Sequence, residues 1–116
     1  MNSQALAMTA RFCSLIAFLL GVLIWAAGAS DLALNFHMIA GGIFLAALWM
    51  LSRRLLTARP WIAAAGFILI PFVVLAGIAP IFVAIDGRLT GVLHLGLALA
   101  AIAVAEMTAK RLKLAV

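Results

Sequence analysis

The chain has 116 residues, of which 69% are apolar and 9% are charged, and its formal net charge is +5. A soluble domain carries roughly 25% charged residues, and so short a chain cannot enclose this much apolar surface in one core, so a water-soluble globular domain is excluded and lipid is the expected medium. The positive charge does not indicate nucleic-acid binding, because the basic residues lie in short clusters between apolar runs without a basic face.

Four apolar stretches follow one another along the chain, at residues 12–29, 32–51, 61–85 and 89–105. A helix needs about 20 residues to cross a hydrocarbon core of about 30 Å, so each stretch is long enough. The runs are continuously apolar, whereas the strands of a membrane barrel alternate over about 10 residues. We therefore expect an all-α integral membrane protein, a four-helix transmembrane bundle that forms a single domain over residues 1–116.

The polar connections between the stretches are short, so successive helices must run antiparallel. Arg88 alone lies on one side of the expected membrane. The other basic residues fall on the opposite side, and they are Arg11, Arg53, Arg54, Arg59, Lys110, Arg111 and Lys113. By the positive-inside rule, the sequence predicts an up-down-up-down bundle with both termini cytoplasmic, in the inner (plasma) membrane as a multi-pass protein.

The first stretch has a second interpretation. Arg11, the apolar run and the small residues 27–29 together resemble a signal peptide with its cleavage site. The run is long for the apolar region of such a peptide. We therefore expect it to be retained as a transmembrane helix.

The second and fourth stretches are similar to each other. A shift of 57 residues places His37 on His94 and Met50 on Met107, and it aligns the basic residues that follow. The first and third stretches do not match convincingly under this shift. The pattern indicates a parallel repeat of two spans, and not the inverted repeat that is common in alternating-access carriers.

The two histidines are the candidate site, since ionisable groups inside a span are costly and often functional. His37 and His94 each lie five residues into their apolar stretch, about 7 Å deep at 1.5 Å per residue. On two helices that run the same way, they can face each other across the bundle. Small residues at helical spacing accompany them, and the predicted cofactor-binding set is His37, His94, Gly41, Gly91 and Ala98.

This pattern leaves several interpretations open. Two such histidines can be the axial ligands of a haem b, with the small side chains leaving room for the porphyrin. They can instead hydrogen-bond neighbouring helices or water without a cofactor, because small-residue stripes are also an ordinary way for membrane helices to approach. A divalent metal or quinone site is the remaining reading. Zinc would need a third protein ligand, which only Asp31, Asp86 or Asn35 could supply.

The other polar residues predict structural roles. Asp31 precedes an apolar helix and is expected to be its N-cap, while Asp86 and Arg88 are expected in an outer turn. Glu106 lies four residues before Lys110, the favourable order for an ion pair within a helix. The single cysteine, Cys13, excludes an internal disulfide and is expected to pack as a small apolar residue.

No phosphate-binding loop, catalytic triad or pair of carboxylates within one span is present, so we do not expect an enzyme. The first expectation is an accessory or interaction subunit of a membrane complex, whose partners are lipid and other membrane proteins or further copies of itself. The alternative is a bis-histidine haem b protein that transfers electrons through His37 and His94. A third reading is a small transporter or channel that acts as a dimer.

Overall fold

The computed structural model describes residues 1–114, which form four helices and, over that range, no strand. The helices are α1 (Ser3–Ala27), α2 (Asp31–Leu55), α3 (Pro60–Phe82) and α4 (Gly87–Leu114). Each is long and apolar enough to cross a membrane. The expectation of an all-helical bundle with four membrane-compatible helices is therefore confirmed.

The hairpin between α1 and α2 has well-defined ends. Gly28 follows α1 with a positive φ of 89°, a conformation that glycine adopts without steric cost. Ser30 is the N-cap of α2, and its Oγ accepts a hydrogen bond of 3.2 Å from the backbone N–H of Ala33. The prediction that Asp31 is this N-cap was wrong, because Asp31 is the first helical residue and lies in the first turn.

The second hairpin closes around Asp86. Its Oδ1 accepts a hydrogen bond of 2.9 Å from the backbone N–H of Arg88, in the first turn of α4. Helix α3 ends at Phe82 and Val83 is extended, so residues 83–85, which the hydropathy pattern included in the third span, lie outside the helix. At the other end of the bundle, α1 and α4 extend beyond the expected spans, to Ser3 and Leu114.

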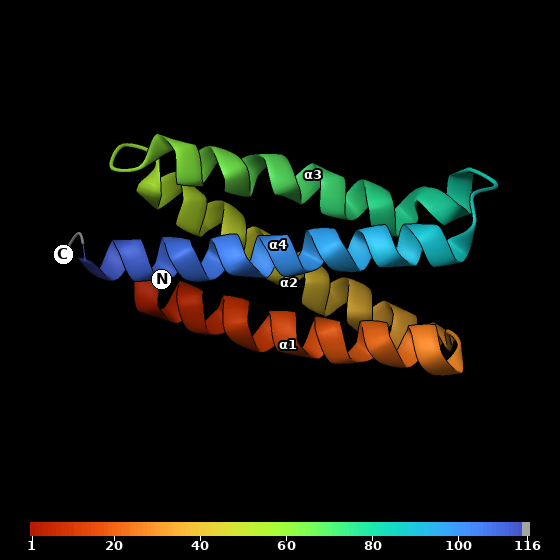
Figure 1. Cartoon of the computed structure of the whole chain (residues 1–116). Helices are drawn as coiled ribbons and strands as arrows, with labels where there is room; N and C mark the ends of the chain where they lie inside the picture. Colours follow the sequence, from red (N-terminus) through yellow and green to blue (C-terminus); the bar gives the residue numbers. More distant parts are fainter. Residues whose placement is uncertain (115–116) are drawn as a thin grey trace.

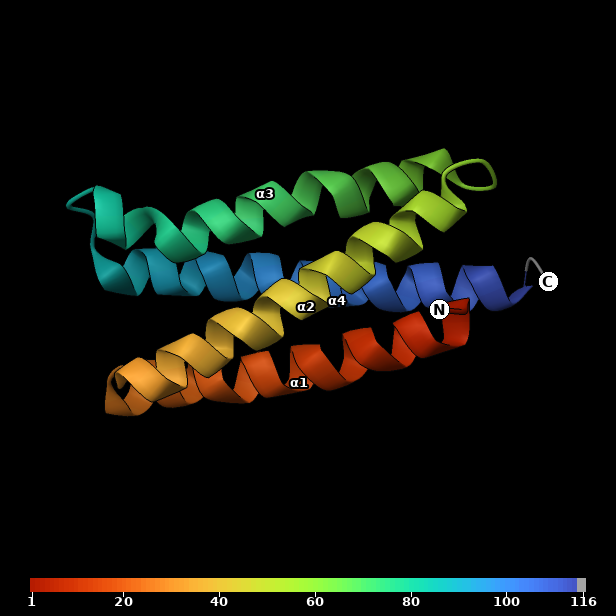
Figure 2. The same cartoon turned by 180° about the vertical axis from the view of Figure 1, so that it is seen from behind.

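Figures 1 and 2 show how the helices are arranged. The start of α1, the end of α4 and the α2–α3 connection lie at one end, which we call the basic end, and the other two connections lie at the opposite end, which we call the histidine end. Helix α2 crosses behind α4 in Figure 1 and contacts it, whereas α1 and α3 make no contact anywhere in the described chain. The most extensive contacts join α1 to α2 and α3 to α4.

The buried apolar core lies mainly in the half of the bundle next to the basic end. It includes side chains from all four helices, with Leu48 and Leu51 fully buried near its centre. Cys13 packs against this cluster as expected. The cluster consists of Leu6, Ala10, Phe44, Ala47, Leu48, Leu51, Leu55, Ile62, Val73, Ala101, Val104, Ala105 and Leu112.

The half next to the histidine end is packed much less tightly. Within residues 18–43 and 71–100, which form this half, the buried residues are Ala40, Val73, Ala76 and Thr90. In Figures 1 and 2 the turn of the α1–α2 hairpin lies apart from the turn of the α3–α4 hairpin. The two hairpins are therefore held together near the basic end and diverge toward the histidine end.

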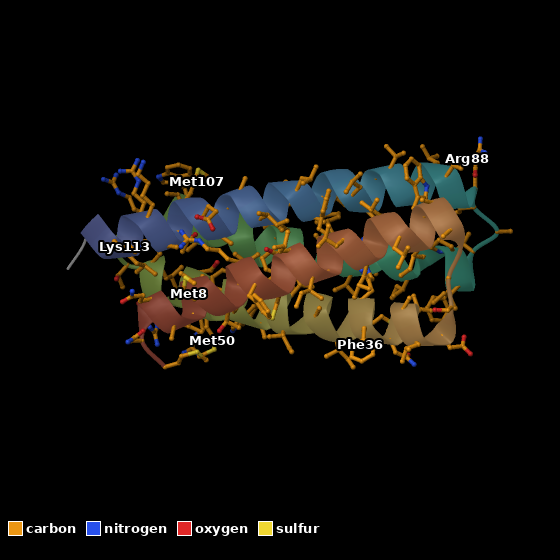
Figure 3. All side chains as sticks on the ribbon, turned by 90° about the horizontal axis from the view of Figure 1, so that it is seen from below. Met8, Phe36, Met50, Arg88, Met107 and Lys113 are labelled. Carbon is orange, nitrogen blue, oxygen red and sulfur yellow. The ribbon has the colours of Figure 1, made fainter. Side chains whose placement is uncertain are left out.

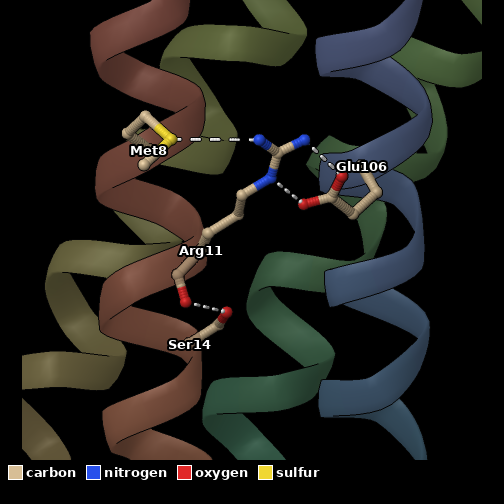
Figure 4. A network of polar contacts seen from close by, with 4 residues as sticks. All are labelled: Met8, Arg11, Ser14 and Glu106. Atoms are coloured by element: carbon tan, nitrogen blue, oxygen red, sulfur yellow. Dashed lines mark hydrogen bonds and ion pairs between the residues drawn. The ribbon is translucent and has the colours of Figure 1, made fainter.

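An ion pair joins α1 to α4 near the basic end (Figure 4). The guanidinium of Arg11 donates from Nε and Nη2 to the two carboxylate oxygens of Glu106, at 2.6 and 2.8 Å. Ser14 Oγ donates to the backbone carbonyl of Arg11 at 3.0 Å. The predicted pairing of Glu106 with Lys110 was wrong: the partner comes from another helix, because Arg11 offers a planar fork that binds both carboxylate oxygens at once.

Candidate functional site

The two histidines are fixed in their hairpins in the same way. Nδ1 of His37, in α2, lies 2.8 Å from the backbone carbonyl oxygen of Ala17 in α1. Nδ1 of His94, in α4, lies 2.9 Å from the backbone carbonyl oxygen of Val73 in α3. Both side chains are half-buried. Each hydrogen bond thus joins the two helices of one hairpin in the loosely packed half of the bundle.

These contacts determine which ring nitrogen carries the proton. A carbonyl oxygen only accepts hydrogen bonds, so Nδ1 of each ring is the donor. In the neutral ring Nε2 then holds the free lone pair. Histidines that ligate metals are commonly oriented in this way, with the second nitrogen donating to a carbonyl or carboxylate. In each ring Nε2 is therefore the nitrogen left to ligate a metal or to accept a hydrogen bond.

A glycine lies against each imidazole, four residues after the carbonyl that the ring contacts. A Cβ added at Gly21 would lie 3.1 Å from Cε1 of His37, and one added at Gly77 would lie 2.9 Å from Cε1 of His94. Any larger residue would push the ring away from its carbonyl. Gly21 and Gly77 are thus part of the site, although they are not among the residues predicted for it.

A signal for these glycines exists in the sequence. A shift of 56 residues, one fewer than the shift that aligns the histidines, places Ala17 on Val73 and Gly21 on Gly77. The two hairpins therefore make equivalent contacts to their histidines, with the first helices offset by one residue relative to the second. A single fixed shift cannot detect both helices of such a repeat.

The two imidazoles lie next to each other where α2 and α4 meet. Their ring centroids are 6.1 Å apart and their planes are inclined at 63°. The structure thus brings together the two histidines that the sequence places at a similar depth. They form a pair of imidazoles between the two hairpins.

The small residues predicted to accompany the histidines have different surroundings. A Cβ added at Gly91 would lie 3.5 Å from Nε1 of Trp25, so this glycine lies under an indole of α1. At Gly41 the added atom would meet nothing within 4 Å. Ala98 is half-buried one turn beyond His94 in α4. The contacts to the imidazoles come from the opposite helices of the hairpins instead.

The donor set limits the chemistry of the site. Within residues 1–114 no group of three or more histidine, cysteine, aspartate or glutamate side chains is placed to hold a metal ion. Structural and catalytic zinc sites use at least three protein ligands. A haem iron would need fewer protein ligands than zinc. The porphyrin supplies four ligands, so two imidazoles would complete six-coordination.

Comparisons of the chain with protein-family models, with curated proteins and with solved structures found no match. No similar protein therefore suggests a function, and a functional proposal has to be based on the geometry of the histidine pair.

Proposed function

We propose that the protein binds one haem b between His37 and His94 and transfers electrons within the membrane. The separation of the rings is the observation that carries this proposal. A metal–imidazole bond is about 2.0–2.1 Å, so two imidazoles on opposite sides of one ion have ring centres roughly 6 Å apart. In the structure the ring centroids of His37 and His94 are 6.1 Å apart.

The hydrogen bonds to Ala17 and Val73 support the same proposal. They leave Nε2 of each ring as the ligating atom and hold the ring in place before a ligand binds. Preorganised ligands of this kind reduce the entropy that is lost on binding. Gly21 and Gly77 keep each imidazole close to the helix that orients it.

The loose packing around the histidines also favours a flat apolar ligand. The hairpins diverge toward this end, and the side chains there are largely exposed. A porphyrin inserted between them would cover apolar surface that the chain itself leaves open. When bound, its iron would supply a one-electron redox centre.

We further propose that the bundle crosses the inner membrane up-down-up-down with both termini cytoplasmic. Figure 3 shows Arg88 at one end and Lys113 at the other, and seven of the eight Lys and Arg residues belong to the basic end. By the positive-inside rule that end is cytoplasmic. The histidine pair then lies in the outer half of the membrane.

A reduced-minus-oxidised absorption spectrum tests the haem proposal. The protein is produced with ample haem precursor, purified in mild detergent and compared with its variants. We expect a b-type band in the unsubstituted protein. His37→Ala and His94→Ala should each abolish it, because either substitution removes one of the two axial ligands.

Neighbouring exposed residues provide matched controls. Met38→Ala and Leu93→Ala change side chains beside the histidines that are 56% and 55% exposed, and both variants should keep the band. Protein made with ample haem that shows no band would refute the proposal. So would a band that persists in both histidine variants.

A second candidate function is that of an accessory subunit packed against another membrane protein. The observation that favours it is a set of outward-facing glycines, since a Cβ added at Gly41, Gly42 or Gly96 would meet nothing within 4 Å. Small residues on a lipid-facing surface allow another helix to approach closely. Such glycines would let a partner pack against α2 and α4.

Purification in mild detergent tests this second candidate. We expect one membrane partner to accompany the protein, to be lost in Gly42→Leu or Gly96→Leu, and to remain in Val74→Leu, which changes an exposed residue of α3. A chain that runs as a monomer alone would refute the accessory role and leave the haem proposal untouched.

A further inference from the structure

A charged cavity lies between α1 and α4 at the basic end of the bundle. It has a volume of about 290 Å³ and is lined by Arg11, Glu106, Met107, Lys110 and Lys113. Figure 3 shows Met107 and Lys113 at this end of α4. The cavity is open to the surroundings.

A shallow, open apolar groove of about 300 Å³ adjoins it. Arg11 and Glu106 line both hollows, so the second continues from the first along the two helices. Its walls include Leu15 and Phe18 from α1 and Leu99 and Ile102 from α4. Phe18 and Leu99 are each seven residues from the ion pair, which corresponds to about 10 Å along a helix.

The charges at the mouth of this groove are not balanced. Arg11 and Glu106 neutralise each other through their two hydrogen bonds. Lys110 and Lys113 are exposed and form no ion pair with any described residue. The mouth therefore has two uncompensated positive charges, which favour an anion.

We propose that the α1–α4 groove binds an anionic glycerophospholipid of the adjacent leaflet. The phosphate lies at Lys110 and Lys113, and one acyl chain runs along Leu15, Phe18, Leu99 and Ile102. Basic pockets at the cytoplasmic side of transmembrane helices are suited to lipid headgroups. The apolar continuation distinguishes this site from surface lysines that attract any anion.

An ion pair crosses the groove between the two helices. The ion pair between Arg11 and Glu106 bridges α1 and α4 at its midpoint (Figure 4), with Ser14 hydrogen-bonded to the backbone of Arg11 just beyond it. A lipid chain would lie along the exposed side of this bridge.

Native mass spectrometry of the full chain in mild detergent tests the proposal. Phosphatidylglycerol and phosphatidylcholine with identical acyl chains are titrated separately. Each lysine near the headgroup is expected to strengthen binding about 5-fold, so Lys110→Gln with Lys113→Gln should weaken phosphatidylglycerol binding about 25-fold. Arg53→Gln with Arg59→Gln removes two exposed charges at the same end, one in the last turn of α2 and one in the α2–α3 connection, and should change this binding less than 2-fold.

Two further arms identify the ligand. Leu99→Trp, which fills the apolar part of the groove at a side chain that is 49% exposed, should weaken binding of both lipids. Inorganic phosphate at millimolar concentration should not displace phosphatidylglycerol, since it has no acyl chain.

Three results would overturn the proposal. The first is equal binding of both lipids to the unsubstituted protein. The second is an equal loss in the lysine and arginine double variants, which would indicate non-specific attraction. The third is displacement of the lipid by inorganic phosphate, which would indicate a site for a soluble anion. None of these results bears on the histidine pair.

Discussion

The crossing of α2 and α3 depends on a glycine, and substituting it gives a sharp test of the packing. Ser52 is fully buried, and its Oγ has no hydrogen-bond partner among the described residues. A Cβ added at Gly66 would lie 2.1 Å from this Oγ and 3.2 Å from the Cβ of Ser52. Both distances are shorter than van der Waals contact, so in Gly66→Ala the side chain of Ser52, or the helix that bears it, has to move.

The size of the effect follows from this geometry. Inserting a methyl group into a packed interior costs typically about 1–3 kcal/mol, and we expect Gly66→Ala to destabilise the protein by that amount. Ser52→Ala removes the atom at 2.1 Å and breaks no described hydrogen bond, so it should cost less than about 0.5 kcal/mol. The double variant should be more stable than Gly66→Ala alone, because only the milder contact at 3.2 Å remains.

Reversible unfolding in mixed detergent micelles, followed by circular dichroism, measures all three variants in one cycle. The expected coupling between the two substitutions is about 1 kcal/mol or more, in the direction of rescue. Gly66→Ala with the stability of the unsubstituted protein would refute the proposed packing of α2 on α3. Strict additivity of the two substitutions would refute it equally.

Three other perturbations follow from the structure. Gly77→Ala should displace its imidazole more than Gly21→Ala does, because the added atom lies at 2.9 Å and not 3.1 Å, and the two shifts can be compared by imidazole NMR signals; equal shifts would contradict the reasoning. Glu106→Gln should loosen α1 from α4 slightly, and added salt should reduce the difference in stability, since the pair with Arg11 is exposed; a salt-independent difference would contradict it. A cysteine at Ala58, in a chain otherwise free of cysteine, should react in intact cells only with thiol reagents that cross the membrane, and labelling by an impermeant reagent would reverse the proposed orientation.

Hydropathy identified the four helices well and their ends less well. It reports which residues suit lipid, whereas a helix ends where its backbone hydrogen bonds end. α1 and α4 therefore continue through polar and basic residues to Ser3 and Leu114, while the apolar residues 83–85 lie in a turn. Similarly, local preference placed Asp31 at the N-cap of α2, but the hydroxyl of Ser30 makes the capping bond.

Contacts between helices were only partly predictable. The similar depth of His37 and His94 was predictable from their positions in the two apolar stretches, and the structure places the two rings side by side. The partner of Glu106 was not predictable from the sequence, because spacing along the chain identifies neighbours within one helix and Arg11 belongs to another helix. Gly21 and Gly77 were missed as neighbours of the imidazoles because they lie on the opposite helix of each hairpin, where the repeat has a different offset.

The most direct test of the account is a titration of purified, haem-free protein with haemin, followed by the change in its absorption spectrum. We predict saturable binding that ends at one haem per chain, and no such end point in His37→Ala or His94→Ala. A chain that folds in detergent and shows no saturable binding, or that binds equally well without its histidines, would contradict the central claim.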